Sequence, residues 1–268
     1  MIKCLVFTKD RPLQFEAYVE SLIFCSGIEE GLIHIIAPND KEYGKLADAY
    51  RACQWFFEND FDQSFERTLS HVVARKFAED DLILFGCDDV IYTRVFNLRS
   101  VELILRSLLP SQTIGFSLRL GVNIRGSASI PADNALFRSW RWRGKPLHFG
   151  YPFELMASVC PAALVSEILR SMPDIRTPNH LEIAGVQYCR QALPDSQLCM
   201  FNSPSYAVAQ DVNRVQDFYQ NVVHGTEEHS AENLLQLYRR GGKLDWTNLF
   251  GINCNDAFVG DQYWKIVQ

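Results

Sequence analysis

The amino-acid sequence predicts an α/β fold built on a mostly parallel, doubly wound sheet. In residues 1–89, short apolar runs suited to buried strands alternate with amphipathic segments of helical spacing. Such alternation is typical of parallel strands joined by right-handed crossover helices. The run at residues 81–87 also leads directly into two adjacent carboxylates, Asp88 and Asp89. Because open α/β sheets bind ligands beyond the carboxyl ends of their strands, this pair marks a candidate site.

The first half of the chain is expected to follow the order β-α-β-α-β-α-β. Strands are expected at residues 2–8, 32–37, 53–57 and 81–87, and helices at 11–27, at 41–51 and from near Asp60 to Phe77. Asp10 is the expected N-cap of the first helix, because Asp accepts a hydrogen bond from the first turn and Pro12 fits that turn.

The second half is expected to add four helices and a further strand. The helices are predicted at residues 96–109, 161–172, 179–193 and 231–240, the strand at 113–120 and a polar loop at 123–133. Asn179 is the expected N-cap of the third of these helices, with Glu182 completing a capping box. Neither a linker nor an internal repeat interrupts the chain, which indicates one domain over residues 1–268.

Composition is that of an ordinary globular protein and excludes several function classes. The 268 residues are 47% hydrophobic and 22% charged. A formal net charge of −6 argues against a nucleic-acid partner, which would require a basic face. The sequence contains no run of about 18 apolar residues, so no transmembrane segment is expected. Lys9 interrupts the apolar N-terminus, so a signal sequence is not expected there either. Eight cysteines without a C-x-x-C pair indicate buried thiols, so a cytoplasmic location is expected.

The acidic pair at the end of the fourth strand suits a divalent cation. Mg²⁺ and Mn²⁺ take hard oxygen ligands, commonly one or two carboxylates plus the phosphates of a substrate. The alternative is that one of Asp88 and Asp89 caps the next helix while the other is solvated.

Several short segments together resemble a known enzyme family. They are Thr8-Lys9-Asp10-Arg11-Pro12, Glu58-Asn59-Asp60-Phe61, Cys87-Asp88-Asp89, Thr177-Pro178-Asn179-His180-Leu181-Glu182, and Val212-Asn213-Arg214-Val215-Gln216 with Asn221. In these segments the chain resembles nucleotide-diphospho-sugar glycosyltransferases of the GT-A fold, and bacterial family 2-like members in particular. The resemblance covers most of the chain. It departs from the family at Cys87-Asp88-Asp89, which is not a strict Asp-x-Asp, and after Tyr151-Pro152-Phe153, where Asp-Gly is missing.

The resemblance implies a single GT-A-like domain with two halves. Residues 1–120 would form a Rossmann-like half that binds the nucleotide sugar, and residues 121–268 a C-terminal lobe on the acceptor side. The implied activity moves a sugar from a UDP- or GDP-sugar donor to a saccharide or other hydroxyl acceptor, with Mn²⁺ or Mg²⁺ as cofactor. The missing Asp-Gly favours an alternative, a non-catalytic nucleotide-sugar-binding protein with a degenerate fold. A nucleotidyltransferase is less favoured, because no Gly-rich phosphate loop follows the first strand.

Each candidate residue has a functional interpretation and a structural one. The metal is assigned to Asp88, Asp89 and Asn213, with Gln216 completing the shell, and Asp89 is the expected direct ligand. The nucleotide is assigned to Thr8, Asp10, Arg11, Arg67 and Asp88, although Asp10 could serve as a cap and Arg11 could be solvated. An inverting reaction needs a carboxylate that accepts the proton of the acceptor hydroxyl, and the candidates are Glu182, Glu154 and Asp133. For Glu182 the catalytic role competes with the capping role.

Overall fold

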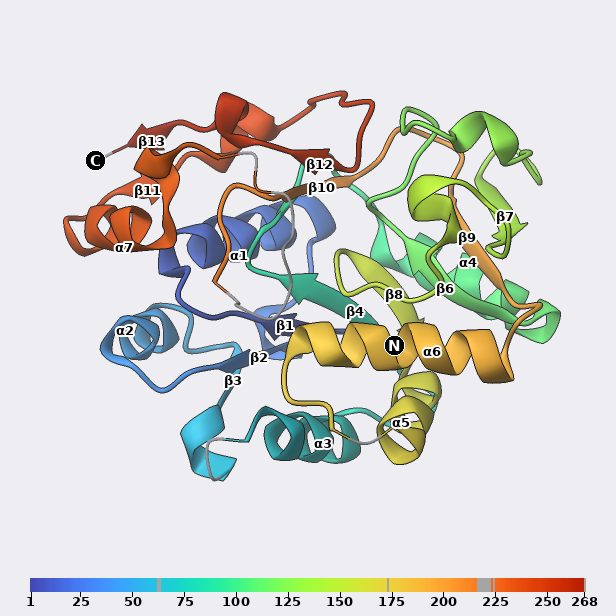
Figure 1. Ribbon diagram of the computed structural model, residues 1–268, viewed down its shortest axis with the longest axis horizontal. Coiled ribbons are helices and arrows are strands. Elements are labelled where there is room, and N and C mark those ends of the chain that lie inside the picture. The colour runs from blue at the N-terminus through green and yellow to red at the C-terminus, as the bar shows by residue number, and fades with distance from the viewer. Residues whose placement is uncertain (62–63, 173, 216–222, 224, 268) are drawn as a thin grey trace.

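The central sheet is mixed and mostly parallel. The computed structural model describes residues 1–61, 64–172, 174–215, 223 and 225–267, and within them eight strands form this sheet in the order β3-β2-β1-β4-β8-β6-β9-β7 (Figure 1). The strands are β1 (Ile2–Phe7), β2 (Ile33–Ala37), β3 (Gln54–Phe57), β4 (Leu82–Cys87), β6 (Thr113–Ser117), β7 (Phe137–Arg141), β8 (Ser158–Pro161) and β9 (Gln197–Phe201). Strands β1 to β4 are parallel, in the order of one half of a doubly wound sheet. β8 is antiparallel to β4 and β6, and β7 is antiparallel to β9. The predicted α/β fold is confirmed.

Helices cover both faces of the sheet. They are α1 (Pro12–Ser26), α2 (Lys41–Ala49), α3 (Phe65–Lys76), α4 (Leu98–Leu108), α5 (Ala162–Ser171), α6 (Pro178–Ala192) and α7 (Ala231–Arg239). One apolar core joins α1, α2 and α4 to one face of the sheet, and a second core joins α3, α5 and α6 to the other face. None of the helices described is both long enough and apolar enough to cross a lipid bilayer.

Strands β1 and β4 form the centre of the sheet because both are apolar on both faces. Along β1, Cys4 and Val6 face the core under α1, whereas Leu5 and Phe7 face the core under α3. In β4, a side chain at Gly86 would place its Cβ 1.9 Å from the hydroxyl oxygen of Tyr18. Glycine therefore lets α1 pack closely on the strand that leads to the acidic pair.

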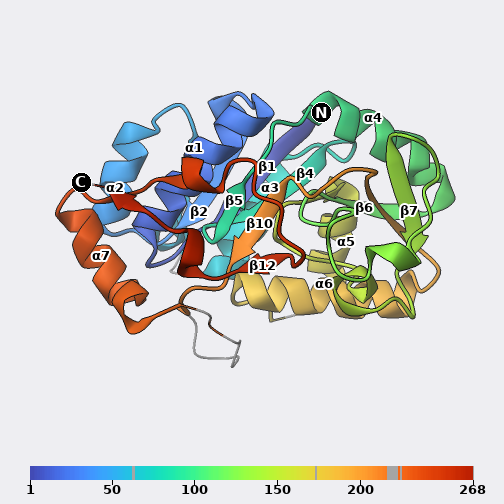
Figure 2. The ribbon, with the colours of Figure 1, turned by 90° about the horizontal axis from the view of Figure 1, so that it is seen from above.

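Two small sheets bring the C-terminal part of the chain against this centre. They contain β5 (Val90–Tyr92), β10 (Ala207–Gln210) and β12 (Phe258–Val259) in one sheet, and β11 (Lys243–Leu244) and β13 (Ile266–Val267) in the other. β10 is antiparallel to β5, and the backbone N–H of Gln210 donates to the carbonyl oxygen of Asp89. The C-terminal segment, red in Figure 2, packs beside α1. Strand β10 thus lies next to the residues that follow β4.

The first and third helices begin later than the sequence predicted. Arg11 is the N-cap of α1 and makes no side-chain capping bond, so the assignment of Asp10 as N-cap is wrong. Asp10 has a left-handed φ of 58°, a conformation that Asp tolerates, and forms the turn between β1 and α1. Helix α3 begins at Phe65 rather than near Asp60, because the Ser64 hydroxyl accepts a hydrogen bond from the backbone N–H of Arg67 and caps the helix.

The start of α6 also differs from the prediction. Thr177 is the N-cap, and its hydroxyl accepts a hydrogen bond from the N–H of His180 at 3.3 Å. Pro178 then occupies the first helical position, where its missing N–H costs nothing. The predicted capping box of Asn179 with Glu182 is therefore wrong, and the carboxylate of Glu182 is not needed to cap the helix.

Helix α6 packs closely on the second half of the chain through a glycine. A Cβ at Gly185 would lie 2.2 Å from a ring carbon of the buried Phe153. We expect Gly185→Ala to lower the free energy of unfolding by about 1–3 kcal/mol, because overpacking outweighs the better helix propensity of alanine. Urea denaturation measures the change. In Gly44→Ala of α2, where the added Cβ meets nothing within 4 Å, the same substitution should be stabilising. Equal stabilisation of both variants would contradict the close contact.

Candidate functional site

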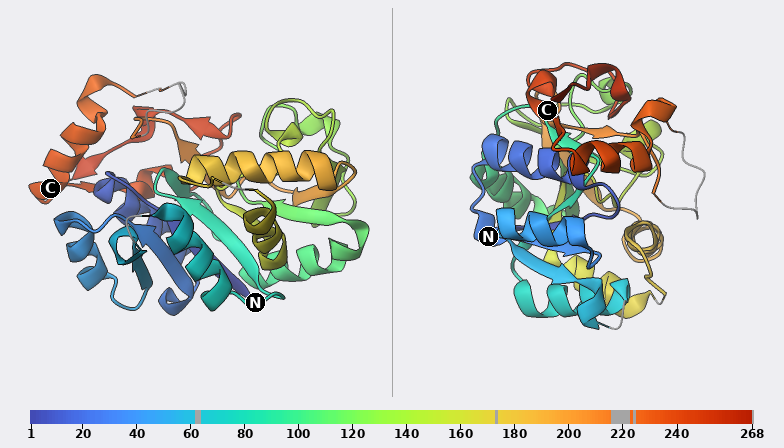
Figure 3. Two further views of the ribbon diagram at one scale, coloured as in Figure 1. Left: turned by 60° about the horizontal axis from the view of Figure 1, so that its bottom comes forward. Right: turned by 90° about the vertical axis from the view of Figure 1, so that its left-hand side faces the viewer.

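A pocket of about 710 Å³ lies at the carboxyl ends of β1 and β4. The start of α6, the golden helix across the centre of the left-hand view in Figure 3, contributes Pro178, Asn179 and Glu182 to the lining. This is the position at which doubly wound sheets bind ligands. The pocket wall brings together six of the predicted site residues, namely Thr8, Arg11, Asp88, Asp89, Glu182 and Asn213.

Arg11 is buried at the centre of the polar cluster. Its Nη1 donates to Asp88 Oδ1 at 3.0 Å and to Asp89 Oδ2 at 3.1 Å. Its Nε donates to Asn213 Oδ1 at 2.8 Å, and its Nη2 donates to the backbone carbonyl of Asn213. Burial alone would lower the pKa of Arg11, but the two carboxylates outweigh it and raise the pKa. The alternative that Arg11 is a solvated surface residue is therefore wrong.

Asp88 is held in place from the end of β1. Its Oδ2 accepts hydrogen bonds from the Thr8 hydroxyl and the Lys9 backbone N–H, both at 3.0 Å, and the Thr8 hydroxyl lies 2.7 Å from that of Tyr43. Burial raises the pKa of Asp88, and the nearby Asp89 adds to this, whereas Arg11 lowers it. Strand β5 follows the acidic pair, so neither carboxylate caps a helix. These hydrogen bonds hold the Asp88 carboxylate in one position beside the Thr8 hydroxyl.

In the cluster around Arg11, Asp89 carries the carboxylate oxygen that has no hydrogen-bond partner among the described residues and that could bind a metal. Its Oδ1 is buried without a hydrogen-bond partner among the described residues. Carboxylate oxygen is a preferred ligand of Mg²⁺ and Mn²⁺. Arg11 already engages Asp89 Oδ2 and Asp88 Oδ1. No group of three or more His, Cys, Asp or Glu side chains that could hold a metal occurs in the described part of the chain. The unpaired Asp89 oxygen offers one protein ligand, so a cation bound here would have to complete its shell with substrate phosphates.

Glu182 projects from the first turns of α6 into the pocket wall. Burial, followed by the charge of Glu154, raises the pKa of Glu182 from 4.5 to about 8. The positive charge of Arg119 and a hydrogen bond from Tyr151 oppose this rise, and Asp89 adds to it. A carboxylate whose pKa lies near neutral pH is suited to take up a proton during a reaction.

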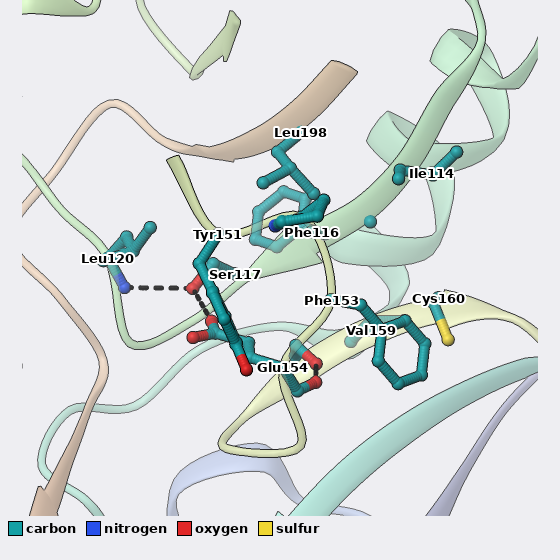
Figure 4. Close-up of a pocket in the computed structure, with 13 residues that line it drawn as sticks. Ile114, Phe116, Ser117, Leu120, Tyr151, Phe153, Glu154, Val159, Cys160 and Leu198 are labelled. Atoms are coloured by element: carbon teal, nitrogen blue, oxygen red, sulfur yellow. Dashed lines mark hydrogen bonds between the residues drawn. The ribbon is translucent and has the colours of Figure 1, made fainter. Parts of the chain in front are cut away.

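The other two candidate bases are placed differently. Glu154 is not in the wall of the main pocket and is already engaged, because it forms a buried ion pair with Arg119. It also accepts a hydrogen bond from the Ser117 hydroxyl at 2.8 Å, in the wall of a separate, smaller pocket (Figure 4). Asp133 is exposed, accepts a hydrogen bond from the backbone N–H of Ser139, and is not part of the pocket wall. Of the three candidates, Glu182 is the carboxylate that lines the main pocket.

Four further residues from the predicted segments lie away from the pocket or beyond the described residues. Asp10 and Arg67 are exposed and do not line the pocket, so their assignment to the nucleotide stays a prediction without structural support. Gln216, which was assigned to the metal or phosphate shell, lies outside the described residues, as does Asn221.

The sequence analysis missed pocket residues contributed by the second half of the chain. Arg119, His148, Tyr151 and Phe258 all line the pocket. Arg119 was taken as part of a strand at residues 113–120, but β6 ends at Ser117. It therefore follows the carboxyl end of a parallel strand, as Asp88 does, and with the end of β6 known the same positional argument would have found it.

The sheet order and the pocket at the ends of β1 and β4 define a GT-A-like nucleotide-diphospho-sugar transferase fold, as the sequence predicted. Over 304 aligned residues the chain is 21% identical to the bifunctional glycosyltransferase pgtA of Dictyostelium discoideum. The alignment covers 98% of this chain and 39% of that protein, so the chain spans well under half of its relative. No protein-family model matches the chain.

Solved structures of similar shape share little sequence with the chain. A Staphylococcus aureus TarS fragment in complex with UDP-GlcNAc has a TM-score of 0.48 at 11% identity, and the match covers 82% of this chain and 62% of that one. A 4-diphosphocytidyl-2C-methyl-D-erythritol synthase has a TM-score of 0.42 at 12% identity, with 82% and 97% covered.

Proposed function

We propose that this chain is a metal-dependent glycosyltransferase that moves a sugar from a nucleotide-diphosphate donor to a hydroxyl acceptor. The observation that carries the proposal is that one pocket contains both the cluster of Arg11, Asp88 and Asp89 and the carboxyl group of Glu182. Glycosyl transfer needs both, because the leaving diphosphate gains negative charge while the acceptor hydroxyl loses a proton. The sequence similarity to a glycosyltransferase over 98% of the chain supports the same reaction class.

The nucleotide would bind at the ends of β1 and β4. Thr8 and Asp88 are fixed to each other there and would hydrogen-bond the base or ribose. Arg11 is held by four hydrogen bonds to Asp88, Asp89 and Asn213, so it offsets part of the carboxylate charge and is not a mobile phosphate ligand. The charge of the diphosphate must then be balanced by another group.

A divalent cation would supply that balance. Asp89 Oδ1 is the protein oxygen that would hold it, with Asn213 nearby on the same cluster. A bound Mn²⁺ or Mg²⁺ acts as a Lewis acid on phosphate oxygens. Without such a cation, the donor diphosphate and the acidic pair would repel each other in the pocket.

Glu182 would act as the general base toward the acceptor hydroxyl. Its carboxyl group is held partly out of water by α6 and by the second half of the chain, which raises its affinity for a proton. Tyr151 lines the same pocket and is close enough to lower the pKa of Glu182, so it would help to orient this carboxyl group. Because Glu154 is neutralised by Arg119, Glu182 is the carboxyl group of this wall that would receive the proton.

The experiment that tests the function is a turnover assay with a panel of UDP- and GDP-sugars. Slow hydrolysis of the donor without an acceptor, and faster transfer when saccharide acceptors are added, are the expected results. Release of UDP or GDP is measured by chromatography. Tight donor binding without turnover on any acceptor would favour the alternative of a nucleotide-sugar-binding protein, and a lack of binding would contradict both.

Nucleotide binding is expected to depend on the cation. In titration calorimetry, UDP or GDP should bind about tenfold or more tightly with Mn²⁺ than with a chelator, because the ion relieves the repulsion between like charges. Asp89→Ala should remove this difference, whereas Asp133→Ala, at an exposed carboxylate outside the pocket wall, should keep it. Equal affinity with and without Mn²⁺ in the wild-type protein would show that the metal assignment is wrong.

A further inference from the structure

Arg119 is a buried cation on the wall of the main pocket. It follows β6 by two residues, is 3% exposed, and lines the same pocket as Asp89 and Glu182. Its guanidinium carbon lies 4.8 Å from the ring centre of Phe258, which covers one face of the group. Such a position holds the guanidinium plane in one orientation.

The guanidinium group is only partly satisfied by the protein. Nη2 donates to Glu154 Oε2, and Glu154 is fixed in turn by the hydroxyl of Ser117 (Figure 4). Nε and Nη1 are buried and donate to no acceptor among the described residues. If Arg119 served only to neutralise Glu154, two charged donors would remain buried without partners. Such groups are costly to bury, so their presence in a pocket wall indicates that a ligand supplies the missing acceptors.

The location of Arg119 indicates which part of the ligand it meets. In the proposed reaction the anomeric carbon must lie between the leaving diphosphate, near Asp89, and the base Glu182. Arg119 is close enough to Glu182 for its charge to act on that carboxyl group. It follows β6, two strands away from β4 in the sheet, on the far side of β8. It is therefore displaced from the nucleotide end of the pocket and borders the space that the transferred sugar would occupy.

We infer that Arg119 is a specificity-determining residue whose Nε and Nη1 donate hydrogen bonds to oxygen substituents of the transferred sugar. This inference rests on the proposed glycosyltransferase function. The sugar would be a neutral hexose, because Glu154 already offsets the charge of Arg119 and leaves Nε and Nη1 as hydrogen-bond donors without a net positive charge for a carboxylate. Hydroxyl or amide carbonyl oxygens meet these requirements, whereas the carboxylate of a hexuronic acid does not.

The test compares Arg119→Lys with the wild-type protein in titration calorimetry. Lysine keeps the positive charge beside Glu154 but lacks the planar fork of donors. The probes are UDP, UDP-glucose, UDP-N-acetylglucosamine and UDP-glucuronate, and GDP with GDP-mannose, each with Mn²⁺. We expect the affinity for the neutral nucleotide-hexoses to fall by about tenfold or more, while the affinity for UDP or GDP alone changes by less than about twofold. The wild-type protein should bind UDP-glucuronate more weakly than UDP-glucose.

Two further variants make the result specific. Arg138→Lys is the matched control, since Arg138 hydrogen-bonds Asn202 and a backbone carbonyl away from the pocket and should leave all affinities unchanged. If Arg119→Lys does not fold, the double variant Arg119→Met with Glu154→Gln removes both charges together and should show the same selective loss for nucleotide-hexoses.

The outcomes separate the inference from the function on which it rests. An equal loss for the nucleotide and for the nucleotide-hexose would place Arg119 at the diphosphate, and no loss for either would leave it a partner of Glu154 alone. Each of these results overturns the inference while leaving the proposed function intact. A wild-type protein that binds none of the probes overturns the proposed function itself.

Discussion

Glu182→Gln is expected to lower the rate of sugar transfer by about 10²-fold or more, the usual effect of losing an acid–base group. Glutamine keeps the length of the side chain and can still accept a hydrogen bond from Tyr151, but it cannot take up the proton of the acceptor hydroxyl. Because Thr177 caps α6, the substitution should not destabilise the helix start. Turnover is measured as release of UDP or GDP at a saturating donor concentration, and donor affinity should change little.

The matched control is Glu167→Gln, at an exposed carboxylate on α5 outside the pocket. It should retain full activity. If Glu182→Gln were also fully active, the base would have to be Glu154 or Asp133, or the reaction would retain the anomeric configuration and need no such base.

The raised pKa of Glu182 predicts two pH dependences. A general base acts when deprotonated, so kcat/KM of the wild-type enzyme should rise with pH up to about 8. The folded-state pKa lies above the unfolded value of 4.5, so the folded state binds the proton more tightly. The resulting stabilisation is full below pH 4.5 and is lost as the pH rises toward about 8. The stability of Glu182→Gln relative to wild type should therefore increase over this range, and a difference independent of pH would contradict the assignment.

Arg11→Met is expected to lower the free energy of unfolding by about 3–5 kcal/mol, the cost of removing one member of a buried ion pair. The change leaves the carboxylates of Asp88 and Asp89 without their buried counter-charge and removes the bonds to Asn213. Urea denaturation at pH 7 measures the loss, and nucleotide binding should weaken with it. Arg143→Met, at an exposed position, should change stability by less than about 0.5 kcal/mol. A similarly small effect of Arg11→Met would mean that the cluster is solvated rather than buried.

Part of the fold and site could be predicted because local patterns determine it. Strands β1 and β4 are buried on both faces, so their sequences are continuous apolar runs, and such runs predict parallel strands. Parallel strands end at one edge of a sheet, so Thr8 and Asp88 could be expected to meet although 80 residues separate them. The contact of Arg11 with the same cluster follows from its place directly after β1.

The rest depended on information that the sequence patterns do not contain. β8 enters the sheet antiparallel between β4 and β6, and nothing in its few apolar residues specifies that partner or direction. At α6, residue preference favoured Asn179 as the cap, whereas Pro178 in the first turn pointed to Thr177. Arg119 was assigned to a strand, because the end of β6 at Ser117 cannot be seen from propensity alone.

A crystal structure of the Glu182→Gln variant with Mn²⁺ and an intact UDP- or GDP-sugar tests the central claim most directly, because the variant should bind the donor without turning it over. We predict that the nucleoside lies against Thr8 and Asp88 and that the ion contacts Asp89 Oδ1. The anomeric carbon should lie between the diphosphate and position 182. A nucleotide bound outside this pocket, or a donor whose sugar points away from position 182, would contradict the account.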